Sequence, residues 1–429
     1  MRGVTTTIYL LGLVSGLLVA MIWREIGPSS RDLAQYRAVR DFARETFVRE
    51  VDDEELLDHA LHGMLAELDP YSRYYDAEES RELERETRGR FKGIGVIFRM
   101  PVTAGQVLYP LAGSPAAIAG VQVGDTFVEV EGRPVAEMSE EEFRAVLREP
   151  EGSALEARLR GLDGEEREAV ITPDSIVDPS VRHTRILDAA RGVGYLAITS
   201  FSHETHREFE RAVEFLQGRG ARALILDLRH NFGGVLESAV MIAGRFIQDG
   251  IIVSTEGRGD PVVYRALPDD AWYAGIPMVV LVDENTASAS EVLAGALQDH
   301  RVAVLVGGPT YGKGMVQTIR SFERFNTRAK VTSSYYYSPT RRNFERSSDP
   351  GRDYGILPDV EILLEPEERS LVHTRLSSYS PGPEAIPHIE AWEQEEGLTL
   401  VSPQPEDPQL AVALGLLLGD RPEANRIER

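Results

Sequence analysis

Apolar runs typical of buried strands alternate with helical segments after Val181, and this alternation most constrains the fold. Strands that alternate with helices favour an α/β layer structure with a largely parallel sheet. The predicted strands are Val193–Thr199, Ala223–Leu228, Met278–Val282, Val302–Val306 and Ala329–Tyr337, and the predicted helices are Glu204–Gln217, Val235–Ile247 and Ser288–Gln298. We therefore predict an α/β core in this part of the chain.

Composition excludes several classes of function. The chain has 429 residues, of which 42% are hydrophobic, which is enough material for two or three domains. Its formal net charge of -23 repels a phosphate backbone, so nucleic acid is not an expected partner. There is no cysteine, so disulfides, zinc thiolate sites and cysteine-protease chemistry are all excluded.

The N-terminus carries an uncharged, mostly apolar stretch from Val4 to Trp23. Its length fits a bilayer-spanning helix of about 20 residues. A cleaved signal peptide is the alternative, although no Ala-x-Ala pattern follows and Gly27-Pro28-Ser29 is a poor substitute. We predict an uncleaved anchor within residues 1–30. The soluble body would then lie on the periplasmic or extracytoplasmic side of the inner membrane, in the cell envelope of a bacterium.

Two further regions precede the core. Apolar residues recur at helical spacing between Asp32 and Leu68, which predicts an N-terminal helical region over residues 31–90. Residues 91–173 change to short strand-like runs separated by glycine, with a capping-box pattern at Ser139 to Glu142.

The second of these regions resembles a PDZ domain. The resemblance rests on the loop Gly93-Ile94-Gly95-Val96, on the turn Gly124-Asp125 and on the late helix. Glycine in such a loop lets backbone N–H groups converge on a carboxylate, beside which a peptide adds as an edge strand. The loop is therefore a candidate substrate-binding site.

A serine and a lysine in the core suggest acyl transfer. Ser288 is framed by small residues at a predicted strand-to-helix junction, and Lys313 stands between two glycines. The usual pKa of a lysine, roughly 10.4, must fall by about 3 to accept a proton near pH 7, which requires a desolvated or charge-poor pocket. The glycine turn at Gly233 and Gly234 opens a helix, where N–H groups favour an oxyanion. The N–H of Ala289 is a second candidate donor.

Together these motifs resemble the carboxy-terminal processing (tail-specific) protease family. The shared features are Ser-Ala-Ser-Glu at Ser288, a Gly-Lys-Gly 25 residues beyond that serine and a glutamine four residues after the lysine. The match covers residues 35–365 in the family's order. It implies Ser288 as nucleophile, Lys313 as general base, Gln317 as the residue that orients the lysine, and an oxyanion hole at Gly233 or Gly234 and Ala289.

The resemblance also implies an architecture. We expect a crotonase-like or ClpP-like core of layered sheet and helices at residues 174–365, with an inserted PDZ domain. A C-terminal extension follows at residues 366–429, with an apolar stretch from Leu410 to Leu418 that docks as a helix. The resemblance further implies that the PDZ domain gates the active site and that self-association or an adaptor regulates it.

The expected function is a serine endopeptidase that binds the free C-terminus of a protein and cleaves near it, without metal or cofactor. An inert PDZ scaffold in the envelope is the alternative from another class. A Ser-His-Asp triad is the chemical alternative, since Ser290, His230, His300 and Asp299 are present. His203 and His206 lack an identifiable third metal ligand. The run Tyr335 to Tyr337 is interpreted as a strand with aromatic packing.

Overall fold

The computed structural model describes residues 28–99, 101–147, 153–346, 354–378, 380–397 and 407–419. Its contacts divide the chain into two compact units, Met1–Ala77 with Ile319–Val331, and Glu78–Thr318 with Thr332–Arg429. Among the described helices, none is both long and apolar enough to cross a membrane. The predicted anchor at residues 4–23 lies outside the described ranges.

The first unit contains the predicted N-terminal helices. They are α2 (Pro28–Thr46) and α3 (Asp53–Ala66), and the Asp52 carboxylate caps α3 by accepting from the Glu55 N–H at 2.7 Å. After α3, the Asp69 carboxylate accepts from the N–H groups of Tyr71 and Ser72, which fixes the turn. Strand β1 (Arg73–Tyr75) then pairs with the beginning of β18 (Thr327–Tyr337).

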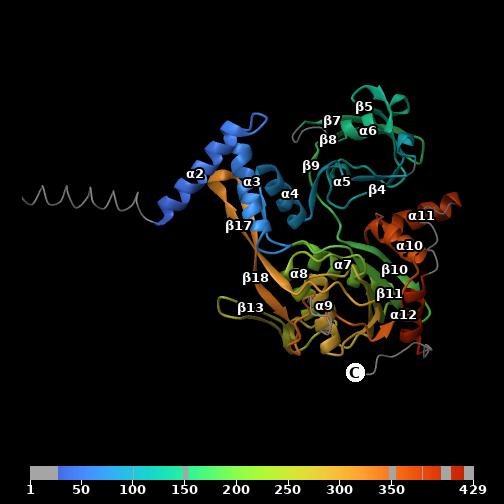
Figure 1. Ribbon diagram of the computed structural model, residues 1–429. Coiled ribbons are helices and arrows are strands. Elements are labelled where there is room, and N and C mark those ends of the chain that lie inside the picture. Colours follow the sequence, from blue (N-terminus) through green and yellow to red (C-terminus); the bar gives the residue numbers. More distant parts are fainter. Residues whose placement is uncertain are drawn as a thin grey trace, which may run out of the picture. The chain divides into compact units, whose positions relative to one another are not determined.

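Helix α4 (Ala77–Arg88) leads to the PDZ-like region of the second unit (Figure 1). Three phenylalanine rings, those of Phe98, Phe127 and Phe143, contact one another edge-on in its core. The predicted capping box between Ser139 and Glu142 is present. The elements are β2 (Arg90–Gly93), β3 (Val96–Phe98), β4 (Val107–Pro110), α5 (Pro115–Ile118), β5 (Thr126–Val130), β6 (Arg133–Pro134), α6 (Glu140–Val146), β7 (Leu155–Arg160), β8 (Glu166–Ile171) and β9 (Asp174–Val177).

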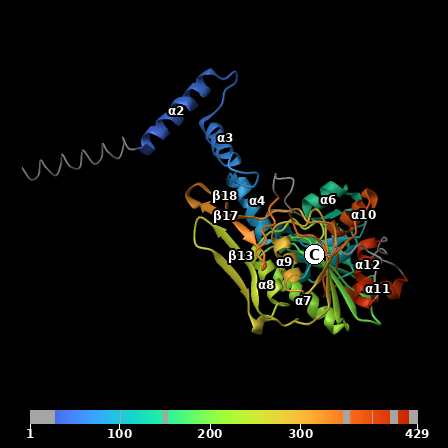
Figure 2. The same ribbon diagram turned by 60° about the horizontal axis from the view of Figure 1, so that its bottom comes forward.

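A six-stranded sheet forms the core in the order β10-β11-β12-β15-β16-β19. Strand β10 is antiparallel to β11, and the other neighbours are parallel, which confirms the predicted α/β core. Helices α7, α8 and α9 lie together against one face (Figures 1 and 2). The bounds are β10 (Val181–Asp188), β11 (Val193–Ile198), α7 (Thr205–Gly218), β12 (Ala223–Asp227), α8 (Leu236–Gly244), β15 (Met278–Val282), α9 (Ala289–Asp299), β16 (Val304–Gly307) and β19 (Val360–Glu361).

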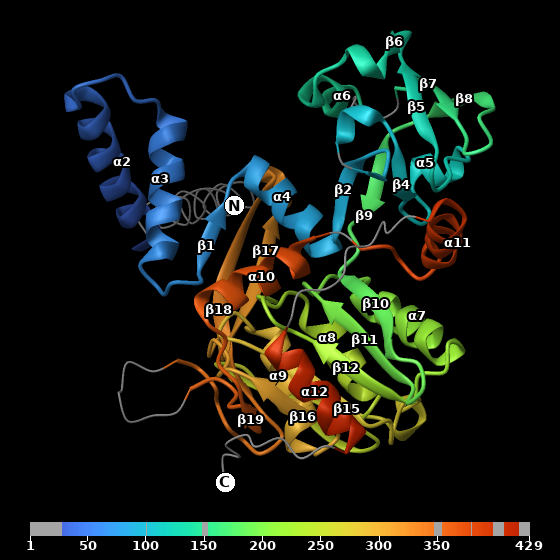
Figure 3. The same ribbon diagram turned by 90° about the vertical axis from the view of Figure 1, so that its right-hand side faces the viewer.

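The C-terminal extension consists of α10 (Pro366–Ser377), α11 (Ile386–Glu396) and α12 (Pro408–Leu418), so the apolar stretch at Leu410 docks as a helix as predicted. Helices α10 and α12 cover the opposite face of this sheet (Figure 3), whereas α11 packs against the PDZ-like region. Strand β12 has apolar side chains on both faces of the sheet, so both faces must be buried. Leu224 and Leu226 pack with α7 to α9, whereas Ala223 and Ile225 pack with α10 and α12.

A second sheet has five strands. It contains β1, β13 (Gly250–Gly257), β14 (Val262–Ala266), β17 (Met315–Phe322) and β18, with the end of β18 paired to β13 at Ser334 to Tyr337. The sequence analysis identified β18 but missed β13, β14 and β17.

A buried ion-pair network joins the core sheet to the C-terminal extension. The Arg229 guanidinium donates to both carboxylate oxygens of Asp227 and to both of Asp407, at 2.6 to 3.0 Å. It also donates to the Gln409 side chain at 2.9 Å. Arg375 on α10 approaches both carboxylates. Asp227, Arg229 and Asp407 expose at most 1% of their side chains, so each charge depends on its partners.

We expect Asp407→Asn to destabilise the chain by about 3 to 5 kcal/mol, because removing one partner leaves a buried guanidinium charge uncompensated. Urea unfolding of the full chain measures the change. Glu390→Gln is the matched control, because the Arg219–Glu390 pair also joins the extension to the core but leaves 35% and 50% of the two side chains exposed. That control is expected to cost less than about 1 kcal/mol. Equal effects would contradict the argument.

Candidate active site

Ser288 occupies the sharp junction between β15 and α9. Its backbone adopts φ 58° and ψ -119°, a region that non-glycine residues rarely enter. Strained backbone of this kind persists where the surrounding contacts enforce it, and it is frequent at active sites. Ser288 is buried, with 7% exposed.

The buried Glu291 carboxylate joins the serine turn to the lysine loop. One oxygen accepts from the backbone N–H groups of Ser288 and Lys313, both at 2.8 Å. The other accepts from the Gly312 N–H at 2.7 Å and the Thr310 hydroxyl at 2.6 Å. Burial raises the pKa of Glu291 to about 7, although these hydrogen bonds favour its ionised form. The backbones of the two predicted catalytic residues are therefore held by the same oxygen atom.

Lys313 lies in the loop between β16 and β17, and Gln317 lies on β17. The Gln317 side-chain nitrogen donates to the Met315 carbonyl at 3.1 Å. The structure thus links the Lys313 backbone to the serine turn through Glu291, whereas the Gln317 nitrogen is directed toward its own strand.

The glycine turn after β12 is held by Asn231. Its backbone carbonyl accepts from the Ala287 N–H at 3.0 Å and from the Ser290 hydroxyl at 2.9 Å. Its side-chain oxygen accepts from the Gly233 N–H at 2.9 Å. The turn is therefore bonded to the residue before Ser288 and to the second residue after it.

Gly233 lies directly against the serine. With φ 96°, a Cβ added there would lie 2.8 Å from the Ser288 Cβ and 3.0 Å from the Ala289 nitrogen. No side chain fits at this distance. The structure therefore brings the predicted oxyanion residues Gly233 and Ala289 together beside Ser288, and Gly234 follows next in the turn.

The sequence analysis missed Tyr336. This residue was interpreted only as part of an aromatic strand, but its buried hydroxyl interacts with the Ser288 side chain. Burial raises the pKa of Tyr336, and the interaction with Ser288 acts in the opposite direction. Its backbone N–H also donates to the Gly314 carbonyl at 2.8 Å, next to Lys313. No sequence motif marks this contact, because it depends on the pairing of β18.

The alternative Ser-His-Asp residues do not come together. The Ser290 hydroxyl is engaged by the Asn231 carbonyl. The His230 ring stacks on His373 with centroids 4.3 Å apart and lies 3.4 Å from Asp283. The His300 ring contacts the Ile251 carbonyl, while Asp299 pairs with Arg342. These contacts give each side chain a structural role.

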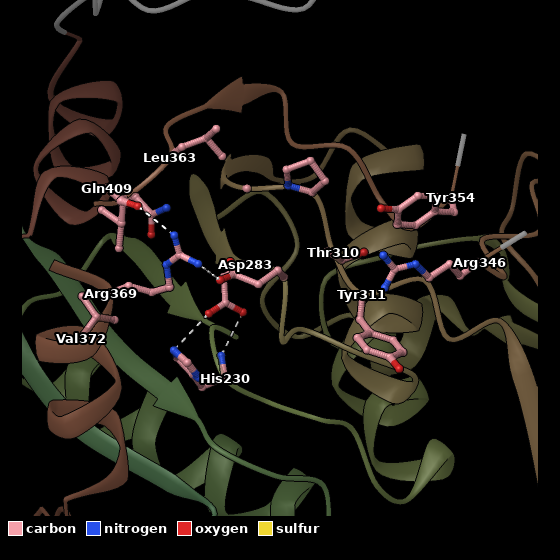
Figure 4. Close-up of a pocket in the computed structure, with 14 residues that line it drawn as sticks. His230, Asp283, Thr310, Tyr311, Arg346, Tyr354, Leu363, Arg369, Val372 and Gln409 are labelled. Carbon is pink, nitrogen blue, oxygen red and sulfur yellow. Dashed lines mark hydrogen bonds and ion pairs between the residues drawn. The ribbon is translucent and has the colours of Figure 1, made fainter. Parts of the chain in front are cut away.

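A cavity of about 380 Å³ borders both loops of the site (Figure 4). His230 and Asp283 line it on one side, and Thr310 and Tyr311, which lead to Lys313, line it on another. Arg369 and Glu284 form an ion pair at its rim at 2.8 Å. Within the described part of the chain, no cluster of three or more potential metal ligands occurs.

The candidate peptide-binding loop has its carbonyl groups turned inward. The Ile94 carbonyl accepts from the Ala116 N–H at 2.9 Å, and the Gly95 carbonyl accepts from the Leu111 N–H at 2.8 Å. In a trans peptide the N–H points opposite to the preceding carbonyl, so the N–H groups of Gly95 and Val96 point outward. Among the described strands, β3 pairs with β4 alone.

Three family models match the chain. Peptidase family S41 matches residues 192–362, a PDZ domain matches residues 106–160, and the N-terminal domain of the activating protease CtpB matches residues 24–79. The PDZ match confirms the resemblance noted for that region.

Similar proteins agree with these matches. A carboxy-terminal-processing protease of Bartonella bacilliformis is 32% identical over 342 residues, which are 77% of this chain and 75% of that protein. A carboxyl-terminal-processing protease of Synechocystis is 32% identical and covers 81% of each chain. Among solved structures, the photosystem II D1 C-terminal processing protease is similar at 27% identity and a TM-score of 0.44, covering 81% of this chain and 92% of its own. The chain therefore belongs to the carboxy-terminal processing proteases of peptidase family S41, which are serine peptidases, and it carries a PDZ domain.

Proposed function

We propose that the chain cleaves proteins near their C-terminus with Ser288 as nucleophile and Lys313 as general base. The observation that carries this proposal is the Glu291 carboxylate, which fixes the backbones of both residues with one oxygen. Neutral Lys313 removes the Ser288 proton as the hydroxyl attacks the scissile carbonyl, then protonates the leaving amine. Water activated by Lys313 releases the acyl group from Ser288.

Tyr336 does not replace the lysine as the base. Its pKa is raised above that of an ordinary tyrosine, mainly by burial, so it stays protonated at neutral pH. A protonated hydroxyl can hold the Ser288 oxygen by a hydrogen bond but cannot take its proton near pH 7. Gln317 orients Lys313 in this proposal, which requires its amide to leave the Met315 carbonyl.

The hydrogen bonds narrow the choice of oxyanion donors. The Gly233 N–H already donates to the Asn231 side chain, so it is committed to holding the turn. The N–H groups of Gly234 and Ala289 then remain as the two proposed donors. Gly233 contributes by its lack of a side chain, which allows the turn to approach Ser288.

The PDZ domain is proposed to capture the free C-terminus of the substrate. The outward N–H groups of Gly95 and Val96 would bind the terminal carboxylate, and the substrate would add as a strand to β3. We further propose that residues 4–23 anchor the chain to the inner membrane, with the body on the periplasmic or extracytoplasmic side, because that stretch is apolar and long enough to span a bilayer. An inert scaffold is less well supported, since it has no need for the bonded serine and lysine loops.

Ser288→Ala and Lys313→Met are each expected to lower kcat/KM on an unfolded peptide by about 10⁴-fold or more, because each removes a group that acts in bond breaking. Lys330→Met is the matched control and is expected to leave kcat unchanged. The Lys330 Nζ lies 5.3 Å from the centre of the Tyr75 ring. Cleavage that survives Lys313→Met would refute the proposed base.

Amidation of the substrate C-terminus is expected to raise KM by about tenfold or more, because it removes the carboxylate that the loop at Gly95 binds, and a charged hydrogen bond is worth about 1.5 to 3 kcal/mol. Steady-state cleavage of a free and an amidated version of one peptide measures this. Equal cleavage of the two peptides would rule out tail capture and leave the chemistry of Ser288 untouched.

Glu291→Gln is expected to lower kcat by about 100-fold with little change in KM, because an amide has one acceptor oxygen for four donors and the serine and lysine loops shift. Glu208→Gln is the matched control, since the Glu208 carboxylate is also buried and accepts from Ser180 and Val181 away from the site. A similar loss of kcat in both variants would refute a specific positioning role.

The ionisation of Glu291 also predicts how the free energy of unfolding changes with pH. Its folded pKa of about 7 lies above the usual 4.5, so the stability it contributes is complete below about pH 4.5 and is lost as the pH rises to about 7. Glu291→Gln cannot ionise and is expected to lack this fall in unfolding free energy. The same slope in both proteins would show that Glu291 is ionised throughout.

A further inference from the structure

Within the described part of the chain, four buried hydrogen-bonding atoms without partners lie beside the core sheet. They are Nε and Nη1 of Arg375, Nη2 of Arg185 and Nε2 of His183. Arg375 exposes 7% and His183 exposes 8% of its surface. Buried polar groups normally have partners, and an unsatisfied one costs about 1 to 3 kcal/mol. A group of four in one place therefore calls for a bound species.

The two arginine side chains share one neighbour, Tyr195. The guanidinium carbon of Arg185 lies 4.8 Å from the centre of the Tyr195 ring, and that of Arg375 lies 5.9 Å from it. His183 lies within electrostatic reach of both arginines. The three side chains thus come together from the edge strand β10 and from α10.

The backbone of β10 is distorted at the two residues that it contributes, His183 and Arg185. The pairing of β10 with β11 shifts register between Arg182 and Arg185, and His183 adopts φ 58° within this bulge. Its backbone N–H donates to the Ser380 hydroxyl. Bulges re-aim side chains and are common next to binding sites. Strain at a non-glycine residue also persists only where other interactions compensate for it.

The charges of the cluster do not balance. Arg185, Arg229 and Arg375 carry three positive charges, whereas Asp227 and Asp407 carry two negative ones. Tyr195 is neutral and donates to Asp227 at 2.7 Å. Burial lowers the pKa of His183 to about 4, so its ring is neutral at physiological pH. Among the residues that the structure describes, one positive charge of the cluster is left without a counter-charge, and water can satisfy donors but cannot neutralise it.

We propose that a small monovalent anion, such as chloride, binds between His183, Arg185 and Arg375. The anion would accept from the unpaired guanidinium nitrogens. It would also accept from the neutral His183 ring in the tautomer that carries its hydrogen on Nε2. The anion would complete the charge balance of the network that holds Arg229, two residues before Asn231 and the oxyanion turn. Its expected role is to stabilise the core and not to take part in cleavage.

Thermal unfolding of the full chain in sodium chloride and in sodium gluconate at equal ionic strength tests the proposal, since gluconate is too large for a site of this kind. At chloride concentrations about tenfold above Kd, the melting temperature is expected to be about 2 to 5 °C higher than in gluconate. Arg185→Met removes the excess charge and is expected to abolish this difference. Arg182→Met, on the same strand but paired with Asp178, is expected to retain it.

Crystals soaked in sodium bromide provide an independent test that does not depend on the variants. An anomalous peak among the three side chains is expected. A water molecule at that place, a chloride effect of the same size in Arg185→Met, or a bromide peak without any chloride effect on melting, which would indicate an adventitious ion only, would each overturn the proposal.

Discussion

The bidentate ion pairs of Arg229 with Asp227 and Asp407 connect the core sheet, the C-terminal extension and the glycine turn beside Ser288. Asp227 ends a central strand of the sheet, and Asp407 begins the helix that covers the sheet's second face. Arg229 itself begins the turn that carries the proposed oxyanion donor Gly234. Because all three groups are buried, none of these segments can move away without leaving an uncompensated charge. The C-terminal extension is thus part of the protease core, although it lies beyond the family's S41 match.

A second buried carboxylate, that of Glu291, fixes the serine and lysine loops relative to each other. Glu291 accepts from the backbone N–H groups of Ser288 and Lys313, so it fixes where the two loops lie. The Ser288 side chain itself interacts with Tyr336. The position of the serine therefore depends on contacts from α9 and from β18.

Sequence patterns predicted the larger elements well, for identifiable reasons. The central strand at Ala223 is an unbroken apolar run because both of its faces are covered, and the capping box at Ser139 is a local signal. The antiparallel strands β13, β14 and β17 were missed because their faces are partly exposed and their patterns are mixed. The predicted strand with aromatic packing is present at Tyr336, which stacks on Phe344, but its contact with Ser288 was missed because that contact follows from the pairing of β18.

The sequence by itself determined the chemistry proposed for this chain, because a serine among small residues, a lysine between glycines and a glycine turn at fixed separations are local properties of the chain. Only the tertiary structure decided how those groups are held. The Asn231 side chain accepts from the Gly233 N–H, and the Glu291 carboxylate accepts from the backbones of the serine and lysine loops. Asp407 pairs with Arg229, which lies 178 residues away in the sequence. Such contacts join segments distant in sequence, and burial gives them their strength, because removing water makes each unpaired charge or donor costly.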